Sequence, residues 1–160
     1  MKDSSCARFG CVPSPTRQWH SGRHWPREES FPEKVWHERA AGGASGTDRV
    51  TFIAERDGVW LGLASGIATD PINPADPGPF LVGMFVDSAE RGQGLGAALV
   101  EAVVAWARSR GAARLYLWVT STNTPAIALY AKCGFQRTGD TQPLPHSPSV
   151  TEFQMVRDLR

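Results

Sequence analysis

Apolar and polar positions alternate near the middle of the chain in a way that predicts paired strands. The stretches 50–55 and 59–68 have strand-like patterns and flank Arg56-Asp57-Gly58. Asp-Gly between two such stretches is among the strongest short signals for a hairpin. We therefore predict two antiparallel strands joined by a tight turn at these three residues.

The next part of the chain changes from a strand pattern to a helix pattern. Residues 69–79 hold four prolines in eleven positions and predict an irregular connection. The apolar run 80–87 predicts a strand, and a helix follows it because apolar residues then recur at spacings of three and four. Gly111 can end this helix. Its predicted buried face consists of Leu95, Ala98, Leu99, Ala102, Val103 and Trp106.

The C-terminal third of the chain predicts an interior strand and a second helix. Residues 114–120 are apolar on both faces, as an interior strand should be. Thr124 is a suitable N-cap for a helix with Pro125 at its first position. Gly134 stops this helix after about Cys133.

The end of the chain completes the predicted sheet. A short strand at 135–137, a proline-rich loop at 139–149 and an alternating strand at 151–159 are expected. These elements predict an α/β (α+β) fold with a mixed, largely antiparallel sheet flanked by helices. A length of 160 residues with 41% apolar positions fits one domain.

The N-terminal residues follow neither pattern. Residues 1–30 mix Ser, Pro, Arg, Trp and His without helical or strand periodicity, so we expect them to be poorly ordered. A short helix is predicted at 31–41, with Pro32 in its first turn. We therefore divide the chain into an atypical segment, 1–30, and a folded domain, 31–160.

Composition and charge narrow the classes of partner. The formal net charge is +1, so no bulk field draws the protein to nucleic acid or to an anionic membrane. No apolar run approaches the roughly 20 residues that span a bilayer, and the N-terminus has no hydrophobic secretory stretch. Three cysteines are too few and too unevenly placed for a disulfide framework. We therefore expect reduced thiols and a cytoplasmic protein.

Two cysteines and two histidines near the N-terminus raise the question of a zinc site. Cys6 and Cys11 precede His20 and His24, but eight residues separate the inner pair, where a zinc finger has about twelve. No strand-strand-helix pattern surrounds them. We therefore predict no metal site, and a zinc-dependent regulator is the weaker alternative.

Glycines gather where the strand 80–87 gives way to the helix. Gly92, Gly94 and Gly96 leave the backbone without Cβ atoms, and the first N–H groups of a helix lack intrahelical partners. The helix dipole and the guanidinium of Arg91 add to the attraction for an anion. This segment therefore predicts a phosphate-binding site.

Two other phosphate-binding motifs fit these residues less well. Residues 92–97 read GQGLGA and formally match the G-x-G-x-x-G/A pattern of dinucleotide-binding folds. That pattern needs an acidic residue about 20 positions on. No acidic residue occurs between Glu101 and Asp140. A P-loop is excluded because no Gly-Lys-Ser/Thr follows.

Two motifs together resemble the GNAT N-acetyltransferase superfamily, over roughly residues 50–160. The first is Q/R-x-x-G-x-G/A, present at residues 91–96, and the second is an Asn followed by ALYxKxGF, present as Asn123 and residues 128–135. The resemblance implies a GNAT-like fold and acetyl-CoA as the acyl donor. The cofactor-binding residues that it implies are Phe85, Val86, Arg91, Gly92, Gln93, Gly94, Leu95, Gly96, Ala97 and Asn123.

The resemblance also implies direct attack of an amine on the thioester in a ternary complex. The strands 80–87 and 114–120 would separate to leave room for the thioester, and the phenol of Tyr130 would give a proton to the departing thiolate. The alternatives are that Tyr130 is a core residue and that Asn123 is a helix-entry residue. The candidates for the general base are Glu55, Asp87, His146 and Glu152, and none stands out.

The acceptor and the effect of the N-terminus stay open at this point. Small-molecule amines, antibiotics, peptide N-termini and lysine side chains are all compatible with the sequence, as is a homodimer. Members of the family usually begin with a strand and an initial helix, and residues 1–30 show neither. The alternative function is therefore an acyl-CoA-binding module with impaired catalysis.

Overall fold

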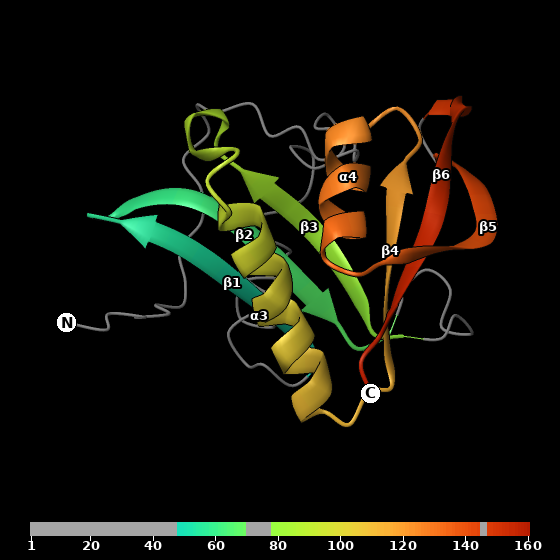
Figure 1. Cartoon of the computed structure of the whole chain (residues 1–160), viewed down its shortest axis with the longest axis horizontal. Helices are drawn as coiled ribbons and strands as arrows, with labels where there is room; N and C mark the ends of the chain where they lie inside the picture. Colours follow the sequence, from blue (N-terminus) through green and yellow to red (C-terminus); the bar gives the residue numbers. More distant parts are fainter. Residues whose placement is uncertain (1–47, 70–77, 145–146) are drawn as a thin grey trace, which may run out of the picture.

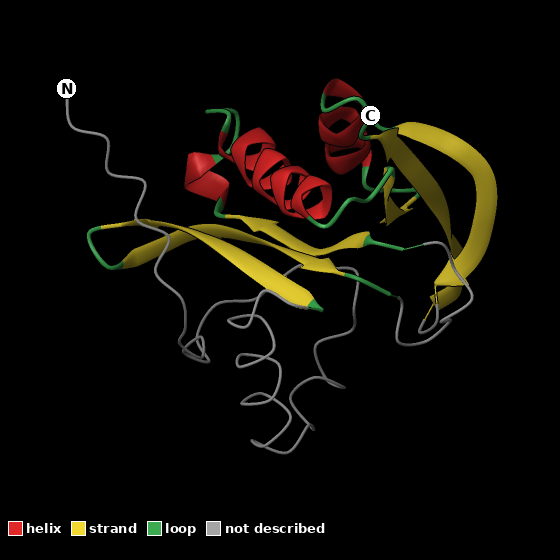
Figure 2. Cartoon of the chain, turned by 90° about the horizontal axis from the view of Figure 1, so that it is seen from below, coloured by secondary structure: helices red, strands yellow, loops and turns green. Residues whose placement is uncertain are grey.

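The computed structural model describes residues 48–69, 78–144 and 147–160. Within these ranges six strands form one sheet in the order β1-β2-β3-β4-β6-β5. The β3–β4 pair is parallel and the other pairs are antiparallel, so the predicted mixed, largely antiparallel sheet is confirmed. Both described α-helices lie on one face of it (Figure 2). The elements are β1 (Arg49–Arg56), β2 (Val59–Ile67), β3 (Phe80–Val86), the 3₁₀ turn η1 (Ser88–Glu90), α3 (Leu95–Ser109), β4 (Arg114–Thr120), α4 (Thr124–Lys132), β5 (Gln136–Leu144) and β6 (Ser147–Asp158).

The hairpin between β1 and β2 forms where the sequence predicts it. Asp57 and Gly58 have positive φ angles of 52° and 78°. This is the backbone of a two-residue turn whose twist matches that of the flanking strands. The two strands then pair antiparallel along their length.

Helix α3 packs against the sheet with a face that is wider than predicted. Leu99, Val103 and Trp106 are buried as expected. Ala98 is exposed, so its assignment to the buried face is wrong. The helix contacts four strands, β1, β2, β3 and β4. Residues on both sides of the predicted apolar face are therefore also buried against the sheet. The additional buried residues are Val100, Val104 and Ala107.

Strand β4 is an interior strand, as its two apolar faces predict. Leu115 and Leu117 are buried on the side of the helices, in one core cluster with the buried face of α3. On the other side Tyr116 packs with Phe80 and Ile67, and the ring centroids of Tyr116 and Phe80 are 5.7 Å apart. The sheet therefore carries apolar side chains on both faces at its centre.

The C-terminal hairpin is longer than predicted. β5 reaches Leu144 and β6 begins at Ser147, so most of the proline-rich stretch predicted as a loop is strand. β5 is an edge strand, where the missing N–H of a proline can face solvent. The pairing of the two strands breaks between Arg137 and Thr141, where Gly139 has a φ of 102°.

Several expectations fall on residues outside the described ranges. These are the poorly ordered segment 1–30, the helix 31–41, the zinc alternative at Cys6, Cys11, His20 and His24, and His146. In the part of the chain that the structure describes, no group of three or more His, Cys, Asp and Glu residues is placed to hold a metal ion. None of the helices in these ranges has the length and apolar character to cross a membrane.

Candidate functional site

The parallel strands β3 and β4 are paired only where they begin. Among the described residues their single register pair is Phe80 with Tyr116, and the N–H of Tyr116 donates to the carbonyl of Pro79 at 2.9 Å. Farther along, β3 stays paired with β2 and β4 with β6. Figure 1 shows the two strands separating toward their carboxyl ends, so the predicted divergence is present.

A bulge in β3 marks the point where the strands separate. Ser65 of β2 pairs with Val82, and Leu63 pairs with Phe85, so two residues of β3 face one residue of β2. The first of these two, Gly83, has a φ of 60°. Because a bulge bends its strand and increases the local twist, it turns the end of β3 away from β4.

The segment between β3 and α3 presents backbone N–H groups. Gly92 and Gly94 have φ angles of 80° and 86°, which favour glycine. Gly94 is the N-cap of α3 without a side-chain cap, and the first helical bond runs from the Ala98 N–H to the Gly94 carbonyl at 3.1 Å. The N–H groups of residues 95–97 therefore lack intrahelical partners, which is the arrangement of an anion-binding helix terminus.

Gly96 lies in a close contact between helices that the sequence analysis did not predict. A Cβ at this position would lie 3.1 Å from Cδ2 of Leu129 and 3.5 Å from Cε of Met84. Gly96 therefore allows α3 to approach α4 closely, whereas Gly92 and Gly94 set the backbone path before the helix.

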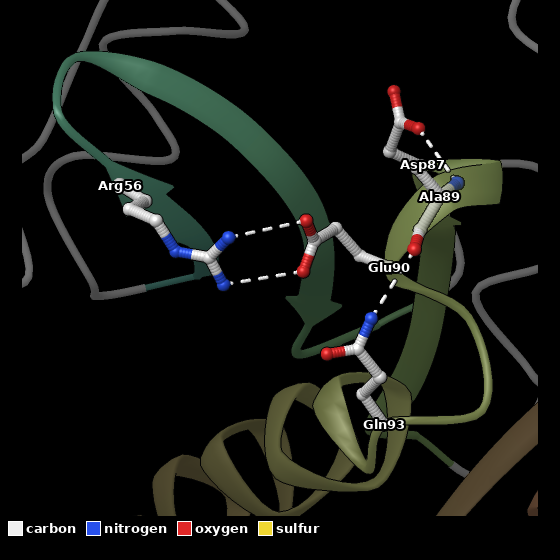
Figure 3. Close-up of polar contacts among 5 residues, drawn as sticks. All are labelled: Arg56, Asp87, Ala89, Glu90 and Gln93. Carbon is white, nitrogen blue, oxygen red and sulfur yellow. Dashed lines mark hydrogen bonds and ion pairs between the residues drawn. The ribbon is translucent and has the colours of Figure 1, made fainter.

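Polar contacts hold this segment beside the β1–β2 hairpin (Figure 3). Arg56 donates two hydrogen bonds of 3.2 Å to the carboxylate of Glu90. Asp87 accepts from the Ala89 N–H at 3.0 Å, and Nε2 of Gln93 donates to the Ala89 carbonyl at 3.2 Å. The Arg56 side chain is largely exposed, so its ion pair orients the segment more than it stabilises the fold.

Arg91 is placed at the end of β3. Its Nε donates to the carbonyl of Val86 at 3.1 Å, which fixes the guanidinium beside the glycines. The structure gives Arg91 no carboxylate partner among the described residues. Its Nη groups are therefore suited to phosphate oxygens.

Asn123 lies at the entrance to α4, and the predicted N-cap at Thr124 is wrong by one residue. The Oδ1 atom of Asn123 accepts a hydrogen bond from the Ala126 N–H at 3.2 Å, so Asn123 is the cap. Pro125 lies in the first turn, at the second helical position and not at the first as predicted. Asn123 is therefore a helix-entry residue, and its Nδ2 group is not used by the cap. Its predicted contact with the cofactor stays a prediction.

Tyr130 is buried in the core on α4. It is 6% exposed, and its ring centroid lies 5.9 Å from that of Phe135. Burial, with a smaller effect of Cys133, raises the pKa of Tyr130 to about 12. No hydrogen bond to its hydroxyl is formed within the described residues. The phenol therefore stays protonated at any pH at which the protein would work.

Burial of Tyr130 predicts a loss of stability at alkaline pH. Since the folded pKa lies above the unfolded value of 10.0, the protonated phenol contributes fully below about pH 10, and this contribution is lost between about pH 10 and 12. We expect about 2–3 kcal/mol of unfolding free energy to be lost over this range. Urea unfolding at pH 9 and pH 11.5 would measure it. Tyr130→Phe should show a smaller loss than the wild type, and an equal loss would contradict the assignment.

The candidates for the general base occupy different environments. Glu55 is exposed on the edge strand β1, and the carboxylate of Asp87 caps η1. Glu152 lies on β6 opposite Thr120, the last residue of β4, and accepts a hydrogen bond from Nε2 of Gln142 at 3.0 Å. Glu152 therefore lies within a strand that is paired with β4, whereas Asp87 follows the end of β3, on the other side of β4.

One buried polar residue escaped the sequence analysis. Gln154 on β6 is 5% exposed and pairs with Trp118 of β4. Its amide forms no hydrogen bond with the described residues. A polar residue in a strand next to an interior strand would have pointed to Gln154. The sequence does not show which strands are neighbours, so this signal could not be used.

Comparison with known proteins assigns the chain to a family. A family model described as the acetyltransferase (GNAT) family matches residues 14–135. The match covers more than half of the chain and includes both the β3–α3 segment and α4.

Individual relatives agree with the family match. A mycothiol acetyltransferase from Thermobispora bispora is 42% identical over 90 residues, which are 54% of this chain and 30% of that protein. The chain spans less than half the length of the first curated relatives it matches. A nourseothricin acetyltransferase structure has a TM-score of 0.63 at 28% identity, over 71% of this chain and 67% of that chain. An aminoglycoside 6'-N-acetyltransferase complexed with coenzyme A has a TM-score of 0.63 at 18% identity, over 85% and 84%, and shows the fold alone.

Proposed function

The chain belongs to the acetyltransferase (GNAT) family, and from this premise we propose that it is an N-acetyltransferase that uses acetyl-CoA. The amine attacks the thioester carbon directly in a ternary complex, the C–S bond breaks, and coenzyme A leaves as a thiol. The observation that carries this proposal is the divergence of β3 and β4 beside an uncapped helix N-terminus. The first feature admits an extended pantetheine arm, and the second suits its diphosphate.

The donor side of the site is built from backbone groups. The N–H groups of residues 95–97 and the guanidinium of Arg91 bind the diphosphate, with Gly92, Gln93 and Gly94 forming the wall of the cradle. Asn123 contributes its remaining Nδ2 donor to the pantetheine arm.

The oxyanion of the tetrahedral intermediate needs a fixed donor at the end of β3. The Asp87 N–H donates toward β2, to the carbonyl of Leu61 at 2.8 Å. Because successive N–H groups of a strand point to opposite edges, the Val86 N–H points toward β4. Of Phe85 and Val86, Val86 is therefore the better donor for the thioester oxygen.

Tyr130 is proposed to donate to the departing thiolate. Its raised pKa keeps the proton on the phenol, but a thiol with a pKa of about 8.5 is already a fair leaving group. We expect Tyr130→Phe to lower kcat by about tenfold to a hundredfold, which is at or below the low end for a general acid. Thiol release measured with saturating acetyl-CoA would test this, with coenzyme A affinity unchanged as the control. An unchanged kcat would leave Tyr130 a core residue alone.

The proposed function is tested by binding and turnover together. Calorimetric titration with coenzyme A should show a single site, and thiol release should follow when acetyl-CoA and a panel of primary amines are added. Binding without turnover of any amine would favour the alternative, an acyl-CoA-binding module. Absence of coenzyme A binding would contradict both.

A further inference from the structure

We propose that Glu152 and Gln154 of β6 bind the amino group of the acceptor, with Gln142 of β5 as a positioning residue. The inference rests on the proposed acetyl transfer and adds the side from which the amine enters. It also names a substrate class, namely a protonated primary amine that carries no carboxylate next to the amino group.

The two residues lie on the face of the sheet opposite the helices. Val119 and Leu117 of β4 pack toward α3, as do their partners Phe153 and Met155 on β6. Side chains alternate along a strand, so Thr120 and Trp118, with their partners Glu152 and Gln154, point to the other face. The helix N-terminus that suits the diphosphate lies on the helix side (Figure 2). Donor anion and acceptor cation therefore approach from opposite faces.

Both residues are next to the part of β4 that β3 leaves. Tyr116 is the β4 residue that pairs with β3, and the pairs Trp118–Gln154 and Thr120–Glu152 come after it. An amine on this face can therefore approach the gap between the diverging backbones. Glu152 and Gln154 are two positions apart, about 6.6 Å along one strand, which is a suitable spacing for two ligands of one amino group.

Gln154 is a buried polar residue whose side chain has no hydrogen-bond partner among the described residues. Its residue is 5% exposed and its amide forms no hydrogen bond with the described residues. Burying such a group without a partner is unfavourable, and few native side chains are left so. A ligand N–H that donates to Oε1 of Gln154 would remove this cost.

Glu152 is held in a defined orientation. Nε2 of Gln142 donates to one of its oxygens, Oε2, at 3.0 Å, and the two residues are register partners on β5 and β6. The structure gives Glu152 no other hydrogen bond or ion pair with a described residue. Its second oxygen, Oε1, is therefore left to accept a hydrogen bond from an ammonium group.

The charges around Glu152 favour a cation. On this face Arg114 lies at the opposite end of β4, where it pairs with Asp158. Arg137 pairs with Met155 and so lies on the helix face, with its guanidinium 4.0 Å from the ring centroid of Phe153. No described cation of β4, β5 or β6 thus lies beside Glu152 on its own face. An α-carboxylate on the acceptor would be repelled by Glu152, and no described cation of these three strands would compensate for that.

The central test is Glu152→Gln, assayed with acetyl-CoA and four amines: butylamine, 1,4-diaminobutane, phenylalaninamide and phenylalanine. We expect the wild type to favour phenylalaninamide over phenylalanine. In the variant, kcat/KM for the accepted amines should fall about 10–100-fold, mainly through KM. The KM for acetyl-CoA and the affinity for coenzyme A should not change.

The matched control is Asp158→Asn. It removes the same charge from the same strand and face, about 20 Å away along β6. Its amine KM should equal that of the wild type. A fall as large as that of Glu152→Gln would overturn the inference.

Gln154→Met separates a binding role from a structural one. If Gln154 only fills space, the apolar variant should leave the amine KM unchanged. If it binds the acceptor, the amine KM should rise while the melting temperature stays equal or increases, because a buried unpaired amide has been removed. This variant also covers the case in which Glu152→Gln does not fold.

Each remaining outcome is decisive. An unchanged amine KM in both variants would overturn the inference. Coenzyme A binding without turnover of any of the four amines would overturn it as well. Loss of coenzyme A binding in the wild type would instead refute the proposed function, which calorimetry detects independently.

Discussion

Replacing Gly94 with Asp should lower the affinity for coenzyme A by about a hundredfold or more. Gly94 is the N-cap of α3 and sits in the proposed diphosphate cradle with a φ of 86°. The new carboxylate would stand where the diphosphate is expected and would repel it. A non-glycine residue in this conformation also costs about 1–2 kcal/mol. Calorimetric titration of the folded variant would measure the loss of affinity.

Two control variants separate charge from strain. Gly94→Asn has the same shape without the charge, so it should bind coenzyme A more tightly than Gly94→Asp. Gly111→Asp places the same residue at the other end of α3, where φ is 74° and a Cβ meets no atom within 4 Å. It should lose stability and keep wild-type affinity. Wild-type affinity in Gly94→Asp would contradict the site.

Replacing Gly66 with Ala should destabilise the protein by about 2–3 kcal/mol. A Cβ on Gly66 would lie 2.6 and 2.7 Å from two ring carbons of Trp106, and 3.2 Å from Cγ1 of Val103. Both neighbours are buried on α3, so neither can move without displacing the helix from the sheet. Urea unfolding would measure the change in unfolding free energy.

A double-mutant cycle tests the cause. Trp106→Leu alone should destabilise the protein because it opens a cavity. Adding Gly66→Ala to Trp106→Leu should cost much less than it does in the wild type, because the ring is gone. Equal costs in the two backgrounds would show that the ring contact is not the reason.

The backbone of the glycine-rich segment between β3 and α3 was predictable because its signals are local. Gly92, Gly94 and Arg91 follow a strand and precede a helix within a few residues, and the positive φ angles there follow from the glycines themselves. The same holds for the turn at Asp57 and Gly58. The close approach at Gly96 could not be predicted in this way, because its contact is with Leu129 on another helix.

The proposed acceptor side was not predictable from the same kind of pattern. Glu152 was one of four candidates for the general base, with Glu55, Asp87 and His146, and none of them stood out. Gln154 was not singled out. Both residues became candidates for the acceptor site because β6 lies next to β4, which is known only from the strand order. The length of β5 was not predicted for a similar reason. Prolines are tolerated in β5 because it lies at the edge of the sheet, and its edge position follows from strand order.

The sequence by itself determined the hairpin turn, the interior character of β4, the glycine-rich entry to α3 and the helix that carries Tyr130. These features depend on residues a few positions apart, so the spacing of apolar residues and glycines in the sequence is enough to predict them. Only the tertiary structure decided where β3 leaves β4, how deeply Tyr130 and Gln154 are buried, and that Glu152 lies on the strand paired with β4. Those properties depend on contacts between distant segments, and no local pattern encodes which strands become neighbours.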